Sequence, residues 1–338
     1  MAALVKAFAK LEVKKWDGKP ISMPGIYSDI PIDDYHSGDI CIEPSVSSSG
    51  LRKLYNPSPN VKASPAHYWV TSPYNNNRIE DDNESDELIL GRAAHHLLFG
   101  QVDFDKEFAI KPAYINGVKC DRTTTHGKLW YQEQAKRGLT VIKLDQIKAV
   151  QGIARELERE PLIVPPNRIN PVTGEEEEVT GILNGLIEHS IFCKHRSGLW
   201  LKVRPDAIPT ESMDYVDLKT TRSIIWPDIQ RSIRDYGYFM QAGLTAMVVQ
   251  AVLGQPLNSY TLVFAESREP HCIEIITLKE NDIARGIAAC EIALTKFVKC
   301  WQEKRWPGPR GDRADAQYLE MTEFDQRRID EAIALDRK

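Results

Sequence analysis

The stretch VRPDAIPTESMDYVDLKTT, Val203 to Thr221, sets acidic residues and a lysine among short apolar runs and raises the question of function. In a β-strand, side chains two residues apart point to the same face, so Asp217 and Lys219 should project together. Leu218 then faces the core, although its backbone carbonyl can still reach the same site. Asp206 ends the preceding predicted strand, and a hairpin of this length can return its carboxylate next to Asp217.

These groups permit two interpretations. Two carboxylates and a carbonyl are hard oxygen ligands of the kind that Mg²⁺ or Mn²⁺ prefers. A lysine beside such an ion could orient and help deprotonate an attacking water, and stabilise charge developing on a phosphate. Alternatively, Asp217 and Lys219 form an exposed ion pair on an edge strand, worth at most about 1 kcal/mol. Strand geometry alone leaves both interpretations open.

The composition excludes some classes of protein. With 42% hydrophobic and 27% charged residues, the chain of 338 residues matches an ordinary globular protein with a sizeable core. A net charge of −5 excludes a basic nucleic-acid coat but is compatible with a locally basic groove beside acidic metal ligands. We find no secretory signal and no apolar run of about 18 residues. We therefore expect a cytoplasmic protein without a membrane partner.

The first half of the chain is predicted to be mainly helical. Serines fit to cap a helix open SSSGLRKLYN at Ser47 and SPAHYW at Ser64. After an acidic loop, ELILGRAAHHLLFG has apolar residues at helical spacing, which predicts a buried helix. Two further helices are expected from Thr123 to about Glu160.

Beyond residue 165 the period changes to that of strands. The run PPNRINPVTGEEEEVTG is a break, in which Glu175 to Glu178 form a solvated loop. Turns are expected at Ser197-Gly198 and at Pro209 to Met213. Predicted strands occupy 185–194, 198–208, 214–221, 259–267 and 271–278, and predicted helices occupy about 227–253, 280–304 and the charged C-terminal end. This order indicates an α/β domain with one sheet flanked by helices.

Pro205-Asp206 followed by Asp217-Leu218-Lys219 resembles the signature of the PD-(D/E)xK nucleases. More closely, the chain is similar to the RecE-type exonuclease (exonuclease VIII) family and its phage relatives, through SSSGLRKL, SPAHYW, GRAAH, IEHSIF, YGYFMQAG and WPG. The resemblance implies an α/β fold with a mixed central sheet flanked by helices. It divides the chain into a mainly helical N-terminal extension packed on the core (1–85), a nuclease core (86–308) and a charged tail (309–338).

The resemblance also implies a ligand set. His95 lies on an apolar helix pattern, where a lone histidine is more often a core residue. It matches the family's G-x-x-x-H motif, in which the histidine supplies a neutral imidazole nitrogen to the metal. His96 points about 100° away on a helix and is the weaker candidate. Mg²⁺, which Mn²⁺ could replace, would then be held by His95, Asp206, Asp217 and the Leu218 carbonyl, with Lys219 activating the water.

Further residues are candidates for catalysis. Glu188, on the first predicted strand, could bind a second metal, hold a metal-bound water, or simply be exposed. Arg234, Tyr238, Gln241 and Thr245 recur at helical spacing and should share one face, which in most helices is merely solvated. In RecB-type and RecE-type nucleases a Tyr and a Gln border the site, so the resemblance implies that Tyr238 and Gln241 position the lysine and contact DNA.

Candidate DNA contacts follow the lysine directly. The hydroxyls of Thr220 and Thr221 and the guanidinium of Arg222 could grip a phosphate, or they could cap the next element. Arg234 is a further candidate on the predicted helix face. Arg204, beside Pro205, is the weakest of these candidates.

The cysteines argue against one cofactor. None of the six has the spacing of a zinc knuckle, so we predict reduced, mostly structural thiols. Some nucleases hold an iron–sulfur cluster on four cysteines, three of them closely grouped near the C-terminus. Here Cys290 and Cys300 stand alone, so we predict no iron–sulfur cluster. No organic cofactor is implied either.

The resemblance implies a metal-dependent exonuclease in the cytoplasm of a bacterial host cell. It would act on double-stranded DNA ends, degrade the strand with the 5′ end, and leave a 3′ single strand for an annealing recombinase partner. It also implies a homo-oligomer, a tetrameric ring around DNA. The alternatives are a related nuclease with another polarity or endonucleolytic cutting, and a DNA-binding assembly protein without hydrolysis.

Overall fold

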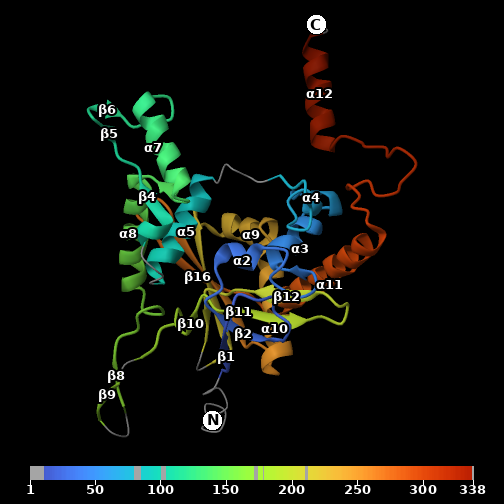
Figure 1. The fold of residues 1–338 in the computed structure, drawn as a ribbon. Coiled ribbons are helices and arrows are strands. Elements are labelled where there is room, and N and C mark those ends of the chain that lie inside the picture. Colours follow the sequence, from blue (N-terminus) through green and yellow to red (C-terminus); the bar gives the residue numbers. More distant parts are fainter. Residues whose placement is uncertain are drawn as a thin grey trace.

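The computed structural model describes residues 11–79, 85–99, 104–170, 174–177, 179–209 and 212–336. Two five-stranded sheets organise this part of the chain (Figure 1). The first has the order β1 (Val13–Lys15), β2 (Gly25–Ser28), β11 (Ser190–Lys194), β12 (Trp200–Val203) and β3 (Ser45–Val46). The second has the order β10 (Leu186–Ile187), β13 (Ala207–Ile208), β14 (Asp214–Thr221), β15 (Ser259–Glu266) and β16 (Ile273–Thr277).

One hairpin is shared between the two sheets, so the expectation of a single sheet was wrong. The strands predicted at 185–194 and 198–208 each divide, so that β11 pairs with β12 in the first sheet and β10 with β13 in the second. The first division falls at Glu188, which has a left-handed φ of 54°. The second falls at Pro205, which has no N–H to continue a ladder. Glu188 therefore lies in a turn after β10 and not, as predicted, on a strand.

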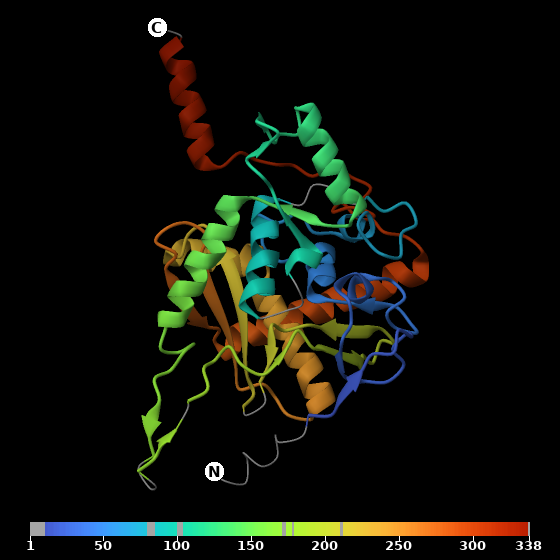
Figure 2. The same cartoon turned by 60° about the vertical axis from the view of Figure 1, so that its left-hand side comes forward.

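The second sheet is covered by helices on both faces (Figure 2). Tyr215 of β14 packs in a cluster with residues of α10 (Tyr238–Leu253) and α11 (Glu280–Glu303). Leu218 packs on the opposite face, in a cluster with residues of α8 (Leu144–Arg159), and α5 (Asp86–Leu98) contacts the same strand. This alternation directs Asp217 and Lys219 to the α10 side, since they follow Tyr215 at intervals of two.

The crossover from β14 to the parallel β15 contains two helices, not the single long helix predicted. The first, α9 (Trp226–Asp235), ends just before Gly237, whose φ of 66° is left-handed. A Cβ there would lie 2.6 Å from Cδ of Arg52, so the close approach of that side chain also requires glycine. Arg234 consequently lies on a different helix from Tyr238 and Gln241, and the predicted common face is wrong in this respect.

The N-terminal segment supplies strands as well as the expected helices. β1, β2 and β3 complete the first sheet, and they are too short for their alternation to be visible in the sequence. The helices here are α2 (Ile32–His36), α3 (Ser48–Leu54) and α4 (Pro65–Trp69). The Ser64 side chain caps α4, as predicted, by accepting from the His67 N–H. Trp69 stacks on Trp306 at 4.7 Å, which ties α4 to the chain that follows α11.

The remaining elements lie around this core. They are α6 (Phe104–Glu107), α7 (Thr125–Lys136), the paired β4 (Phe108–Ile110) and β7 (Thr140–Ile142), and the hairpins β5 (Tyr114–Ile115) with β6 (Val118–Lys119) and β8 (Arg168–Ile169) with β9 (Glu176–Glu177). Glu176 and Glu177 of the predicted solvated loop therefore form a strand of a hairpin, paired with β8. Glu178 lies outside the described residues. The turn predicted at Ser197-Gly198 is present, and the one at Pro209 to Met213 falls partly outside them.

The C-terminal helix α12 (Glu323–Asp336) extends away from the rest of the chain in both views (Figures 1 and 2). None of its described residues is buried. Across the described part of the chain, no helix combines the length and apolar character that a membrane span requires.

Candidate metal centre

Strand register brings Asp206 and Asp217 together. Ala207 of β13 pairs with Val216 of the antiparallel β14. The residue before Ala207 and the residue after Val216, which are Asp206 and Asp217, therefore stand opposite each other and share a face. The Leu218 N–H donates to Oδ2 of Asp206 at 2.5 Å, which fixes that carboxylate. Asp206 is 6% exposed and Asp217 is 1% exposed. Two carboxylates buried this deeply require positive charge nearby.

His95 supplies part of that charge from α5. Its Nδ1 lies 3.2 Å from Oδ1 of Asp206, and its Nε2 lies 3.1 Å from the Leu218 carbonyl oxygen. Burial opposes a charged imidazole, but attraction to Asp206 outweighs burial and raises the pKa of His95 to about 9. The same attraction lowers the pKa of Asp206 against the effect of its own burial. His96 is buried against Phe104 and Phe108, as a core residue would be.

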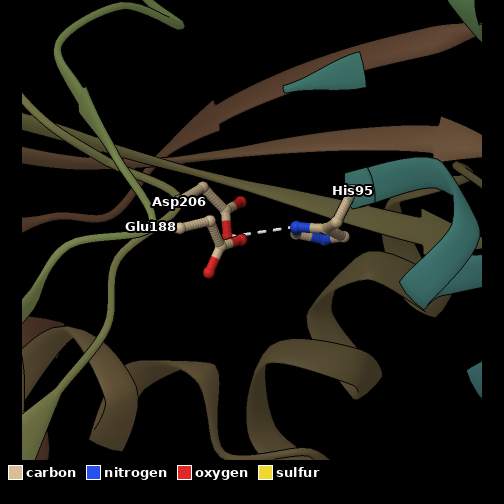
Figure 3. A group of neighbouring side chains, drawn as sticks. All are labelled: His95, Glu188 and Asp206. Atoms are coloured by element: carbon tan, nitrogen blue, oxygen red, sulfur yellow. Dashed lines mark ion pairs between the residues drawn. The ribbon is translucent and has the colours of Figure 1, made fainter. Parts of the chain in front are cut away.

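Glu188 reaches the same point from the turn after β10. Its backbone N–H donates to the Asp206 carbonyl at 3.1 Å, so the left-handed turn places the glutamate beside the aspartate. Figure 3 shows both carboxylates facing the His95 ring. One potential ligand atom from each of His95, Glu188 and Asp206 lies within 4.8 Å of the others. Among the described residues, these three form the group of His, Cys, Asp and Glu side chains suited to hold a cation.

Asp217 and Lys219 stand next to this group. The Lys219 ammonium contacts Oδ2 of Asp217, and Gln241 Nε2 of α10 donates to Oδ1 of Asp217 at 2.9 Å. Burial and repulsion from Asp206 raise the pKa of Asp217, although Lys219 opposes the rise. Burial acts to lower the pKa of Lys219, but attraction to Asp217 outweighs it and raises the pKa. The Lys219 ammonium also lies 4.9 Å from the centre of the Tyr238 ring, a cation–π contact.

The donor set fits a divalent cation. The potential ligands are carboxylate oxygens, a backbone carbonyl and an imidazole nitrogen. They converge from α5, from β14 and from the two points, near Glu188 and Pro205, where the strands of the shared hairpin divide. A protonated His95 now bridges Asp206 and the Leu218 carbonyl, and a bound cation would supply the positive charge that this proton provides. The predicted metal ligands His95, Asp206 and Leu218 thus meet in space. Asp217 adjoins them while it contacts Lys219 and Gln241.

The residues predicted to contact DNA lie in different surroundings, and most of them have partners within the protein. Arg222 forms an ion pair with Glu87 of α5, and Arg234 donates to Asp235 at 2.7 Å. The Thr221 hydroxyl donates to the Ser223 carbonyl at 3.1 Å. This local hydrogen bond agrees with the alternative role for Thr221, capping of the next element, and not with a phosphate contact. Thr220 faces α5, where a Cβ at Gly91 would lie 3.3 Å from its hydroxyl. Arg204 donates to Ser190 and to the Ile30 carbonyl and lies over the Tyr35 ring, so it stabilises the break between β12 and β13.

No role was predicted for Arg52 of α3. Its guanidinium donates to the Tyr236 carbonyl, and attraction to Tyr238 and Asp217 partly offsets the lowering of its pKa by burial. The only signal in the sequence was a basic residue beside Leu51 in a capped helical pattern. A cavity of about 220 Å³ also opens beside the site, with a lining that includes Ser48, Ser49, Glu188, Arg204 and Gln241.

The mixed α/β fold and the arrangement of Asp206, Asp217 and Lys219 define a PD-(D/E)xK-like domain. Residues 47–318 match the family described as "PDDEXK-like domain of unknown function (DUF3799)", and the chain belongs to this family. A crystal structure named "Putative exonuclease" from Eubacterium rectale is similar with a TM-score of 0.52 and 15% identity, over 83% of this chain and 91% of that chain. At this identity the likeness shows the fold alone. Comparison with curated proteins gave no match.

Proposed function

We propose that this chain is a metal-dependent double-strand DNA exonuclease. One observation carries the proposal: two buried carboxylates, a lysine and a histidine from separate elements meet beside Glu188 at one place. An ion pair on an edge strand would leave the charges in water. Here Asp217 lies on an interior strand between β13 and β15, which removes that alternative for this pair.

The residues have distinct roles in the proposed reaction, which is hydrolysis of a phosphodiester bond. His95, Glu188, Asp206, Asp217 and the Leu218 carbonyl would hold Mg²⁺ or Mn²⁺. When bound, the cation supplies Lewis-acid stabilisation of a phosphate oxygen and lowers the pKa of a bound water. Lys219 would orient and help deprotonate the attacking water and stabilise developing charge. Gln241 fixes Asp217 by a hydrogen bond, and the Tyr238 ring fixes Lys219.

The finer features of the proposal come from the resemblance to RecE-type exonucleases. Degradation would run from the 5′ end and leave a 3′ single strand for a single-strand annealing recombinase. A homo-oligomeric, tetrameric ring would keep the enzyme on its substrate. Such a closed ring requires a head-to-tail interface between copies.

The proposal is tested with linear duplex DNA labelled separately at each 5′ and each 3′ end, with and without Mg²⁺. We expect Mg²⁺-dependent release of the 5′ label as mononucleotide, with the 3′ label retained on long strands. Early release of the 3′ label would reverse the polarity. Cutting of closed circular duplex would instead show an endonuclease, and binding without release of either label would show a DNA-binding protein without hydrolysis.

A further inference from the structure

Tyr236 is an aromatic residue to which the proposed reaction gives no role. Its side chain follows α9 and is 61% exposed. Its ring lies 5.8 Å from the ring of Tyr238 at an interplanar angle of 44°. Tyr238 in turn contacts the Lys219 ammonium. The exposed tyrosine is therefore two contacts away from the lysine of the candidate metal centre.

The backbone at Tyr236 is fixed although its ring is exposed. Its N–H donates to the Ser232 carbonyl at 2.9 Å, and its carbonyl accepts from the Arg52 guanidinium. Gly237 follows in a left-handed conformation, packed against Arg52. A ring presented from a fixed backbone loses little conformational freedom when it binds a ligand.

Exposure alone would not distinguish this residue, since single exposed aromatic side chains are common. The charges around it indicate which part of a DNA strand it could contact. Arg234 pairs with Asp235, and Arg231 pairs with Asp228, so these two arginines of α9 already have carboxylate partners. The Asp235 carboxylate also accepts from the Ser58 hydroxyl at 2.6 Å, so its ion pair with Arg234 is anchored within the protein. The apolar face of the ring is what this end of the helix offers a nucleic acid.

We infer that Tyr236 stacks on a nucleobase of the DNA strand beside the phosphodiester that is cleaved. The inference rests on the proposed function, because it takes DNA as the substrate. Stacking there would place the adjoining phosphate on the side of Tyr238 and Lys219. Every base has an aromatic face, so such a contact would hold the strand without selecting a sequence.

The test measures binding of a short fluorescent single-stranded oligonucleotide by anisotropy in EDTA, where no hydrolysis is needed. A second oligonucleotide of equal length carries abasic sites along its central part. We expect Tyr236→Ala to bind the base-containing strand about 5- to 150-fold more weakly, the range for one base–aromatic stack. Its affinity for the abasic strand should equal that of the wild type. Tyr236→Phe and Tyr236→Trp should bind both strands as the wild type does.

Two controls keep the result specific. Tyr318→Ala removes a fully exposed tyrosine on the C-terminal segment and should leave binding of both strands unchanged. Tyr236→Leu keeps an apolar side chain without an aromatic face, so it should weaken binding even if the alanine variant unfolds. Equal losses on both strands, no loss with either variant, or no binding by the wild type would overturn the inference. Base-dependent binding without release of end label would contradict the proposed hydrolysis, and it would leave standing the contact between Tyr236 and a nucleobase.

Discussion

Asp217 shows how a single side chain acquires its role from three elements. Its own strand supplies Lys219, α10 supplies Gln241, and β13 brings Asp206 opposite. The pairing of Asp217 with Lys219 could be predicted because a strand period of two is local. The position of Glu188 could not, because its left-handed turn depends on the division of a hairpin between two sheets.

Substitutions of Lys219 and of Asp206 should distinguish a role in catalysis from a role in metal binding. We expect Lys219→Ala to reduce the rate of duplex degradation by about 10²- to 10³-fold, the typical loss of one stabilising charge. Its stabilisation by Mn²⁺ in thermal unfolding should persist, because the histidine and Asp206 remain. Asp206→Ala should lose both the activity and the Mn²⁺-dependent rise in the unfolding temperature.

The same pair of measurements can contradict the assignment. Unchanged activity in Lys219→Ala would show that the lysine does not act in the reaction. An Mn²⁺-dependent shift that survives in Asp206→Ala would place the cation elsewhere. Thr295→Ala, at an exposed position of α11, serves as a control that should alter neither measurement.

Lys202 is a buried amine outside the site, and it predicts a dependence of stability on pH. It is 4% exposed and donates to the Tyr35 carbonyl at 2.5 Å. Burial lowers its pKa from 10.5 to about 8. Between these values the unfolded chain binds more protons than the folded one, so this residue's contribution to the free energy of unfolding rises with pH across that window.

We therefore expect Lys202→Met to stabilise the protein at pH 7 by about 1–3 kcal/mol, reduced from the full effect by loss of the hydrogen bond to Tyr35. The gain should shrink towards pH 10. Urea unfolding at the two pH values measures it. Lys128→Met, at an exposed position of α7, should change stability by less than about 0.5 kcal/mol. A destabilised Lys202→Met at pH 7 would refute the expectation.

At the scale of elements, predictability followed the length of the pattern. β14 and α8 have long periodic runs; β14 has its expected bounds, and α8 lies within the stretch where two helices were expected. The long helix expected at 227–253 breaks at Gly237, since one glycine inside a helical pattern does not show which distant side chain will pack against it. The three N-terminal strands of two to four residues were missed because such short strands have no measurable alternation.

The crossing of α10 and α11 depends on two glycines that face each other. A Cβ at Gly243 would lie 2.3 Å from the carbonyl carbon of Gly286, and one at Gly286 would lie 1.9 Å from the Phe239 carbonyl oxygen. Because backbone atoms cannot yield locally, Gly243→Ala must push the helices apart. We expect a loss of about 1–3 kcal/mol in the free energy of unfolding, as in other overpacked cores.

This change should also lower nuclease activity, because α10 carries Tyr238 and Gln241. Urea unfolding and the end-label assay on the same preparation measure both effects. Gly308→Ala is the matched control, since a Cβ there has no neighbour within 4 Å and the glycine has no left-handed φ. Equal stability of the two variants would contradict the tight crossing.

For the whole molecule, the mixed α/β class was predictable from the order of elements, but its division into two sheets was not. The shared hairpin places Asp206 and Glu188 at the two points where the sheets part. A cation held there would bind both strands of the hairpin at once. The site and the junction of the sheets are therefore the same place.

The C-terminal helix α12 stands outside this arrangement. None of its described residues is buried, and an isolated helix of this length is marginal in water. Deletion of residues 322–338 should therefore change the free energy of unfolding by less than about 0.5 kcal/mol. Urea unfolding tests this, and light scattering gives the mass of the assembly beside it.

We also expect the number of chains in the assembly to stay the same in the truncated protein. That result would place any contacts of the proposed ring within the two sheets and their helices. A fall in both mass and stability would show instead that α12 packs between copies. That outcome would fit its exposed Phe324 and Leu335, which are 67% and 72% exposed in the single chain. Because these side chains lie far from the metal ligands in sequence and on no shared element, Mg²⁺-dependent release of the 5′ label should survive the deletion in either case.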